Sequence, residues 1–161
     1  MKKLGLVVLV FAAACGGDDG GGAGKMALST VSGFMGGTVT GNGTFEQGAA
    51  DTAADSVTVT ITLNGCTAGK AYPVHIHQGS ACTDATTQGG HWDMTRGEGI
   101  PNIMCSGTTG TTTYNRVATD ATLKWSVADG SATDVVGHTI VVHDADTPTT
   151  RIACGTITSA Q

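Results

Sequence analysis

The sequence predicts an all-β domain, either a β-sandwich or a Greek-key β-barrel of about eight strands, with one long loop. Three observations lead to this fold class. The 161 residues include 25 Gly and 27 Thr, residue types that weaken helices, and Thr and Val favour strands. Apolar and polar residues alternate over short segments that end at Gly-marked turns. No useful length of chain has a helical period, which argues against a helical bundle or a coiled coil.

The first residues resemble a bacterial lipoprotein signal rather than part of the fold. Lys2 and Lys3 precede a short apolar stretch, residues 4–14, and Cys15 follows its small residues directly. We therefore expect residues 1–14 to be a signal peptide and Cys15 to carry a diacylglycerol anchor. The alternative is an ordinary signal peptide that leaves a free thiol. The apolar stretch is too short to span a bilayer.

The Gly-rich residues 15–25 are expected to form a flexible tether, because they cannot bury enough surface to become ordered. The chain would then be an exported lipoprotein of the bacterial cell envelope, on the periplasmic side or at the surface. Removal of Lys2 and Lys3 changes the formal net charge from −5 to −7. No basic stripe is visible, so nucleic-acid binding is not expected.

The predicted domain covers residues 26–161, in which strands follow one another at short intervals. The clearest strand is 56–63, where four apolar residues alternate with threonine and Asn64-Gly65 marks a turn. Residues 78–101 form a long irregular loop, and long loops in compact domains are usually functional. The other predicted strands are 27–31, 37–47, 72–77, 111–117, 121–127, 138–143 and 151–158.

Export also sets the state of the cysteines, because disulfides form and persist outside the cytoplasm. Apart from Cys15, the chain has four cysteines, which allow three pairings: Cys66, Cys82, Cys105 and Cys154. An even number favours two disulfides over free thiols. A cysteine metal cluster is less favoured, since no Cys-x-x-Cys spacing occurs.

Four of the five histidines are candidate metal ligands. His75 and His77 are two residues apart on a predicted strand, so both rings point to one face and can reach one ion. His91 follows Gly89-Gly90 in the long loop, and His143 ends an apolar strand. Neutral imidazole suits copper, zinc and iron. The alternative is an exposed polar strand face, an interpretation that two further histidines at loop and strand ends weaken.

The fifth histidine, His138, begins its strand with the opposite pleat parity to His143 and is interpreted as structural or exposed.

Four short motifs in this order resemble the copper/zinc superoxide dismutase family over roughly residues 26–161. They are His75-Ile76-His77, Gly90-His91-Trp92, the run from Gly137 to Asp144 that contains Val141-Val142-His143, and Arg151-Ile152-Ala153-Cys154-Gly155. The triplet Phe45-Glu46-Gln47 also resembles the family. The resemblance implies an eight-stranded Greek-key β-barrel, in agreement with the strand count.

The resemblance also implies roles for individual residues. The copper ligands would be His75, His77, His91 and His143, with His91 at the position that bridges copper to zinc. Cys82 and Cys154 match the family's disulfide, which leaves Cys66 and Cys105 to pair with each other. Arg151 matches the active-site arginine that attracts and orients superoxide.

Two departures from the family bear on zinc and on access to the site. No histidine follows His91 in the long loop, so His91, Asp93 and Glu98 could offer three zinc ligands at most, where a structural site needs about four. Only seven residues separate His143 from Arg151, where the family has a long loop. Both losses resemble the copper-only branch of the family, so zinc binding is doubtful and the site should be open and shallow.

The function that follows is copper-dependent dismutation of superoxide to oxygen and hydrogen peroxide outside the cytoplasm, with Arg151 and His91 as catalytic residues. The alternatives are a copper-binding surface module without turnover and a structural surface domain.

Without zinc, the second nitrogen of His91 needs another partner. Glu98 is favoured over Asp93 for this contact, because its flanking glycines let the loop fold back. The alternative is that both carboxylates are solvated surface groups. A flexible tether favours a monomer.

Overall fold

The computed structural model describes residues 24–48, 56–92, 95–117 and 122–160. Residues 1–14, Cys15, most of the expected tether and Asp93 lie outside the described residues. The fold is all-β and antiparallel, as the sequence predicts. Seven strands form one sheet in the order β5-β8-β9-β1-β2-β3-β7. Their bounds are β1 Met26–Gly33, β2 Thr40–Gln47, β3 Ser56–Asn64, β5 Val74–His77, β7 Thr109–Val117, β8 Thr139–His143 and β9 Arg151–Ser159.

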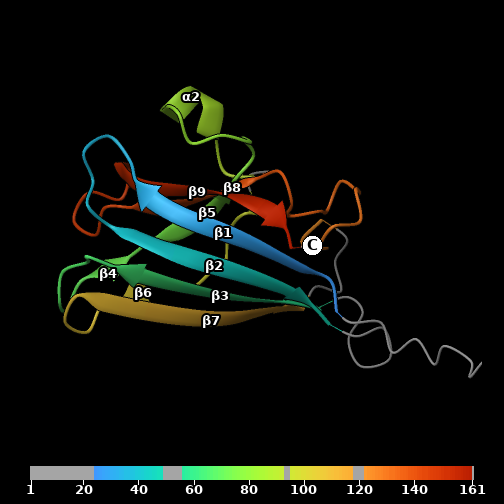
Figure 1. The fold of residues 1–161 in the computed structure, drawn as a ribbon, viewed down its shortest axis with the longest axis horizontal. Coiled ribbons are helices and arrows are strands. Elements are labelled where there is room, and N and C mark those ends of the chain that lie inside the picture. The colour runs from blue at the N-terminus through green and yellow to red at the C-terminus, as the bar shows by residue number, and fades with distance from the viewer. Residues whose placement is uncertain (1–23, 49–55, 93–94, 118–121, 161) are drawn as a thin grey trace, which may run out of the picture.

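The sheet curls so that its two halves face each other across the core (Figure 1). Alternate residues of β3, among them Val59 and Ile61, are completely buried. A Cβ atom on Gly43 of β2 would lie only 2.6 Å from Ile140 Cδ1 of β8. Strands that are distant in the sheet order therefore pack closely face to face, and glycine at position 43 permits that approach.

A proline divides one strand into two parts that pair with different partners. β4, Ala71–Tyr72, pairs with β6, Ile103–Met104, whereas β5 pairs with β8 on the other side of Pro73. Proline has no N–H to donate to a ladder, but its carbonyl accepts a hydrogen bond from the His143 amide at 2.9 Å. The divided strand thus links the β8 side of the sheet to the β6–β7 turn.

One predicted strand is wrong. The described part of 121–127 forms turns, with a single parallel bridge from Ser126 to Asp134. Trp125 is fully buried, and its Nε1–H donates to the Arg96 carbonyl at 2.7 Å. The apolar alternation in this segment therefore reports burial rather than strand pairing.

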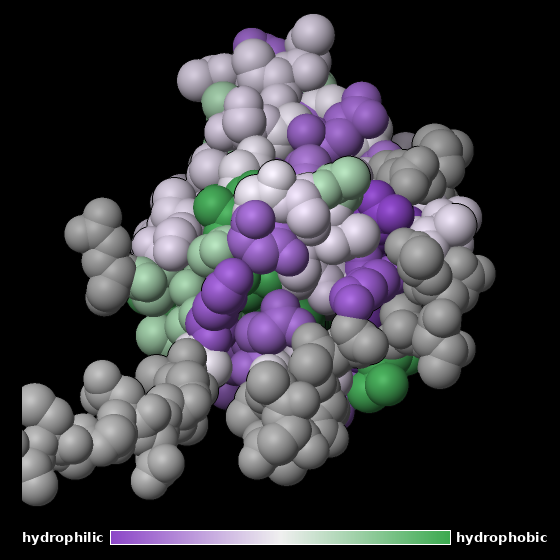
Figure 2. All heavy atoms as spheres, turned by 90° about the vertical axis from the view of Figure 1, so that its right-hand side faces the viewer, coloured by the Kyte–Doolittle hydropathy of each residue, from purple (hydrophilic) through white to green (hydrophobic). Residues whose placement is uncertain are grey.

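Two short elements were not predicted from the sequence, and one of them lies in the stretch expected to be an irregular loop. β6 lies just beyond the long loop, and α2, Ala85–Gln88, is a four-residue helix within it. Asp84 caps α2 through bonds from the Thr86 and Thr87 amides, both at 2.8 Å. Among the described residues, none of the helices is long and apolar enough to cross a membrane. Hydrophilic side chains predominate on the end of the molecule that lies at the right of Figure 1 (Figure 2).

Candidate metal centre

Three strand positions and one loop position bring four imidazoles together. His75 and His77 lie on the same face of β5, and β5 pairs with β8 so that His75 is opposite Val141. His143 is two residues beyond Val141 and therefore shares that face. His91 reaches the cluster through an isolated antiparallel bridge to His77. One ligand atom from each of the four rings lies within 4.8 Å of the others.

The ring nitrogens of His77 and His143 face each other inside the protein. His77 Nδ1 lies 3.0 Å from the Gly89 carbonyl, and His77 Nε2 lies 3.3 Å from His143 Nε2. Burial lowers the pKa of both rings to about 4, because the charged form loses its hydration. Both rings are therefore neutral at physiological pH, which is the form that binds metals.

The carboxylate of Glu98 lies between two of the histidines. One oxygen contacts His91 Nδ1, and the other lies 3.3 Å from His75 Nε2. Glu98 thus accepts from one nitrogen of each ring and leaves the other nitrogen of each ring unused. His75 Nδ1 is buried and has no hydrogen-bond partner among the described residues. The other sequence candidate for this contact, Asp93, lies outside the described residues.

The backbone around Glu98 is held against β5. The Ile76 amide donates to the Gly97 carbonyl at 3.0 Å. A Cβ atom on Gly97 would lie 2.0 Å from the Ile76 carbonyl oxygen, so only glycine permits this approach. Gly99 has a φ of +94°, which a residue with a side chain rarely adopts. These two glycines explain how the carboxylate between them reaches the cluster.

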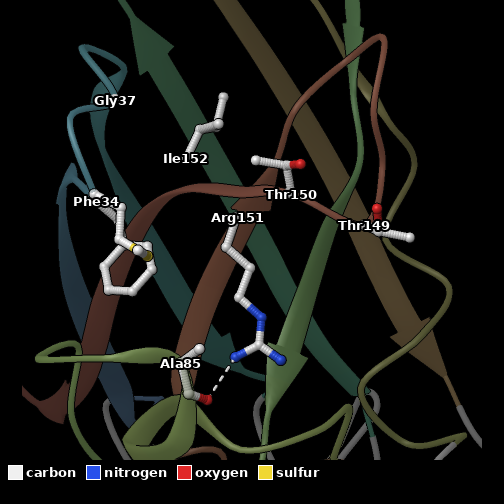
Figure 3. Close-up of a pocket in the computed structure, with 8 residues that line it drawn as sticks. Phe34, Gly37, Ala85, Thr149, Thr150, Arg151 and Ile152 are labelled. Carbon is white, nitrogen blue, oxygen red and sulfur yellow. Dashed lines mark hydrogen bonds between the residues drawn. The ribbon is translucent and has the colours of Figure 1, made fainter.

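Arg151 lies next to the cluster but is bonded to the long loop. Its Nη1 donates to the Ala85 carbonyl at 2.9 Å and to Gln88 Oε1 at 3.0 Å, and its Nη2 donates to the Gly89 carbonyl at 2.8 Å. The Gly89 carbonyl is also the partner of His77 Nδ1. A cavity of about 560 Å³ adjoins Arg151, and Figure 3 shows its guanidinium extending from β9 toward Ala85.

The described structure contains two disulfides, and one of them fastens segments that carry the site. Cys82 is bonded to Cys154 and Cys66 to Cys105, which are the pairs that the family resemblance implies. The Cys82–Cys154 bond attaches the start of the long loop to β9, the strand that begins with Arg151. The bond therefore helps to hold Arg151 and the loop in one arrangement.

His138 stands apart from the other four histidines. Its ring stacks on Trp92 with 4.2 Å between ring centroids, and its Nδ1 lies 3.2 Å from the Gln78 carbonyl. Sequence reasoning missed Gln88, which is completely buried against Arg151. No motif marks a glutamine in that place, and its position before Gly89-Gly90-His91 is the only signal that could have drawn attention to it.

The donor set suits copper. Within the described ranges, the four histidines are the only group of three or more His, Cys, Asp or Glu side chains that could hold an ion. His75 Nδ1 is buried without a hydrogen-bond partner in the described structure, a costly state for a nitrogen lone pair. Imidazoles are good ligands for copper, and a bound ion would satisfy this unpaired nitrogen.

A family model described as copper/zinc superoxide dismutase matches residues 39–157. Three similar solved structures are forms of Candida albicans superoxide dismutase 5. One single-site mutant is 20% identical, with a TM-score of 0.62 and coverage of 85% of this chain and 93% of that one. A second mutant is 19% identical, with a TM-score of 0.61 and coverage of 84% of this chain and 90% of that one. The Cu(II) form is 17% identical, with a TM-score of 0.62 and coverage of 86% of this chain and 94% of that one. A search of curated proteins finds no match.

Proposed function

The chain belongs to the copper/zinc superoxide dismutase family, and from this premise we propose that it is a copper-dependent enzyme that converts superoxide to oxygen and hydrogen peroxide. The observation that carries the proposal is the convergence of four imidazoles, with ligand atoms within 4.8 Å of one another. His75, His77, His91 and His143 would hold the copper. When bound, copper supplies one-electron redox chemistry that oxidises one superoxide and reduces the next.

The protein's part in the reaction is to attract and orient superoxide and to supply a proton to the reduced product. Superoxide is an anion. Removal of Lys2 and Lys3 would change the formal net charge of the chain from −5 to −7, and a protein with this charge repels superoxide on average. The Arg151 guanidinium, fixed by three acceptors in the long loop, supplies a local positive field beside the histidines. It is planar and permanently charged, so it can orient the anion at any physiological pH.

His91 is the residue that we assign to proton handling. Its Nδ1 contacts Glu98, which accepts a hydrogen bond from that nitrogen and fixes the tautomer. The other ring nitrogen, Nε2, then faces the cluster and can take up a proton for the reduced product. Zinc is not needed for this arrangement, because Glu98 occupies the outer side of the ring. We therefore propose a site that uses copper alone.

Two disulfides indicate an extracytoplasmic location. We propose further that residues 1–14 are removed and that Cys15 carries a lipid anchor, followed by the tether. The domain would then act as a monomer on the membrane surface, where it meets superoxide that forms outside the cytoplasm. Mass spectrometry of the mature N-terminus tests the anchor.

Metal analysis combined with a superoxide-consumption assay tests the function. The mature chain carrying Cys15→Ser, which cannot be lipidated, is loaded with copper alone, with zinc alone, or with both. We expect one copper per chain, turnover with copper alone, and no increase when zinc is added. Copper binding without turnover would favour the copper-binding surface module instead. A chain that binds no copper would favour a structural domain.

A further inference from the structure

We propose that Gln88 is a positioning residue that fixes the Arg151 guanidinium while leaving its positive charge uncompensated. This inference rests on the proposed function, since Arg151 is assigned there to the attraction of the anionic substrate. Gln88 is completely buried, and its Oε1 accepts a hydrogen bond from Arg151 Nη1 at 3.0 Å.

The acceptors around Arg151 share one property, which is that all of them are neutral. Two are the backbone carbonyls of Ala85 and Gly89, and the third is the Gln88 side-chain amide. None of the ion pairs among the described residues includes Arg151. An arginine in a structural role is commonly paired with a carboxylate, which orients the side chain but cancels its charge. The amide orients it and leaves the charge available.

The amide of Gln88 can face Arg151 in only one way. A flip would bring the NH₂ group against a guanidinium N–H, and both groups only donate. With Oε1 on Arg151, Nε2 is buried without a hydrogen-bond partner among the described residues. Leaving a buried donor unpaired is destabilising. An apolar side chain of the same length would avoid that cost, so filling space alone does not account for a glutamine here.

The backbone of Gln88 is held independently of Arg151. It ends the capped helix α2, and its carbonyl accepts from the Gly79 amide at 2.9 Å. A Cβ atom on Gly79 would lie 1.9 Å from the Thr87 carbonyl oxygen, so the two parts of the loop are in close contact. The position of the amide is therefore set by the loop, and the amide in turn sets the guanidinium.

The position of the guanidinium is in turn connected to a candidate copper ligand. The Gly89 carbonyl accepts from Arg151 Nη2 at 2.8 Å and lies 3.0 Å from His77 Nδ1. A guanidinium that shifts away from Gln88 would also lose its alignment with this shared carbonyl. Gln88 thus controls the distance between the anion-attracting group and the histidines without touching either substrate or metal.

Two substitutions separate position from charge. Gln88→Glu keeps the shape and the acceptor but neutralises Arg151, and Gln88→Met keeps the length but removes the acceptor. The matched control is Gln47→Glu, the same chemical change at the end of β2, where the amide binds the Val127 N–H at 2.9 Å. Azide, a small anion that binds copper, serves as the probe in visible titrations of the copper-loaded mature chain, alongside copper content and the unfolding midpoint.

We expect Gln88→Glu to weaken azide binding about tenfold, the low end of what a local field contributes, with copper content unchanged. The ionic-strength dependence of superoxide consumption should fall in parallel, and Gln47→Glu should change neither. In the metal-free protein, ¹⁵N relaxation of Arg151 Nε should report greater mobility in Gln88→Met than in the wild type.

Equal azide affinity in Gln88→Glu and the wild type, or an equally rigid Arg151 in Gln88→Met, would overturn the proposal. These two results do not require turnover. A wild-type chain that binds copper and azide but consumes no superoxide would refute the proposed enzyme and leave the role of Gln88 in anion binding supported. A chain that binds no copper would refute the proposed function, and the relaxation measurement would then decide the positioning role on its own.

Discussion

Three histidines of the cluster each place one ring nitrogen against an acceptor outside it. One nitrogen of His77 meets the Gly89 carbonyl, and one nitrogen each of His75 and His91 meets Glu98. These acceptors lie outside the cluster and determine which nitrogen carries the proton. One ligand atom from each of the four rings lies within 4.8 Å of the others, so these acceptors set the tautomers of three converging rings before any ion is bound.

Removal of a converging ring should weaken copper binding sharply. We expect His75→Ala and His143→Ala each to lower copper affinity by at least about 100-fold, since a change that only touches a ligand already costs 10–100-fold. His138→Ala is the control, because its ring stacks on Trp92 outside the cluster. Copper retained after dialysis against a chelator is the measurement. A copper signal that survives in both ligand variants would refute the assignment.

Glu98→Gln tests the carboxylate that bridges two rings. Each ring meets a different oxygen of Glu98, and in glutamine an NH₂ donor replaces one of these oxygens, so one ring loses its acceptor. We expect copper to be retained and turnover to fall about tenfold, within the range for partners of metal ligands. Glu46→Gln, a change at an exposed position of β2, is the control. Unchanged turnover in Glu98→Gln would contradict the role of the bridge.

At the scale of elements, the loop after 122–127 is organised by one carboxylate rather than by strand pairing. Asp134 is nearly buried, and its oxygens accept four backbone N–H groups at 2.7–2.9 Å, those of Ala128, Asp129, Gly130 and Val136. A carboxylate that accepts hydrogen bonds from several backbone N–H groups replaces the bonds that pairing with another strand would supply. The loop is therefore rigid without being a strand.

Loss of this carboxylate should destabilise the domain without affecting metal binding. We expect Asp134→Ala to lower the free energy of unfolding by about 3 kcal/mol, because buried amides lose a charged acceptor. The control, Asp146→Ala, breaks an ion pair whose aspartate side chain is 70% exposed, and such pairs contribute less than about 1 kcal/mol. Urea unfolding measures both. Equal stabilities of the two variants would show that the loop does not depend on Asp134.

The Cys82–Cys154 disulfide connects the long loop to β9 across 72 residues of sequence. In the chain-entropy model a closed loop of that size contributes about 4 kcal/mol. We expect the double variant Cys82→Ala, Cys154→Ala to lose stability of that order and to bind azide more weakly, because the loop that holds Arg151 is released. The double variant at Cys66 and Cys105 should lose stability while keeping azide affinity, as the unfolding and azide titrations would reveal.

At the scale of the whole molecule, the histidine cluster makes stability depend on pH. The folded-state pKa of His77 and of His143 is about 4, below the ordinary value of 6.5, chiefly because both rings are buried. Between these values the unfolded chain binds more protons than the folded one, so stability rises with pH. The pKa values of His75 and His138 are lowered in the same direction, again chiefly by burial.

The metal-free mature chain should therefore lose stability as the pH falls from about 6.5 toward 4. Each fully shifted ring corresponds to a few kcal/mol, roughly 1.4 kcal/mol for every pKa unit. Urea unfolding at pH 7.5 and pH 5 measures the loss, and His143→Gln, which removes one titrating ring, should reduce it. Equal stability at the two pH values would contradict the burial of neutral rings.

Much of the fold follows from local sequence patterns. The alternation of β3 places Val59 and Ile61 in the core, as its period of two requires. The same period puts His75 and His77 on one face of β5. The segment at 121–127 shows where this reasoning ends: its apolar residues alternate in the sequence, but its described part forms turns that insert Trp125 into the core.

The sequence by itself determined the all-β fold, the pair of histidines on one strand face and, through a family resemblance, the four converging rings. Only the tertiary structure decided which groups hold Arg151 and the loop after 122–127. Gln88 meets Arg151 across 63 positions of the chain, and Asp134 gathers amides of the loop that follows the segment expected to be a strand. Periodicity reports which face of an element is buried. Partners brought together by the closure of a curled sheet depend on long-range packing, which no local pattern encodes.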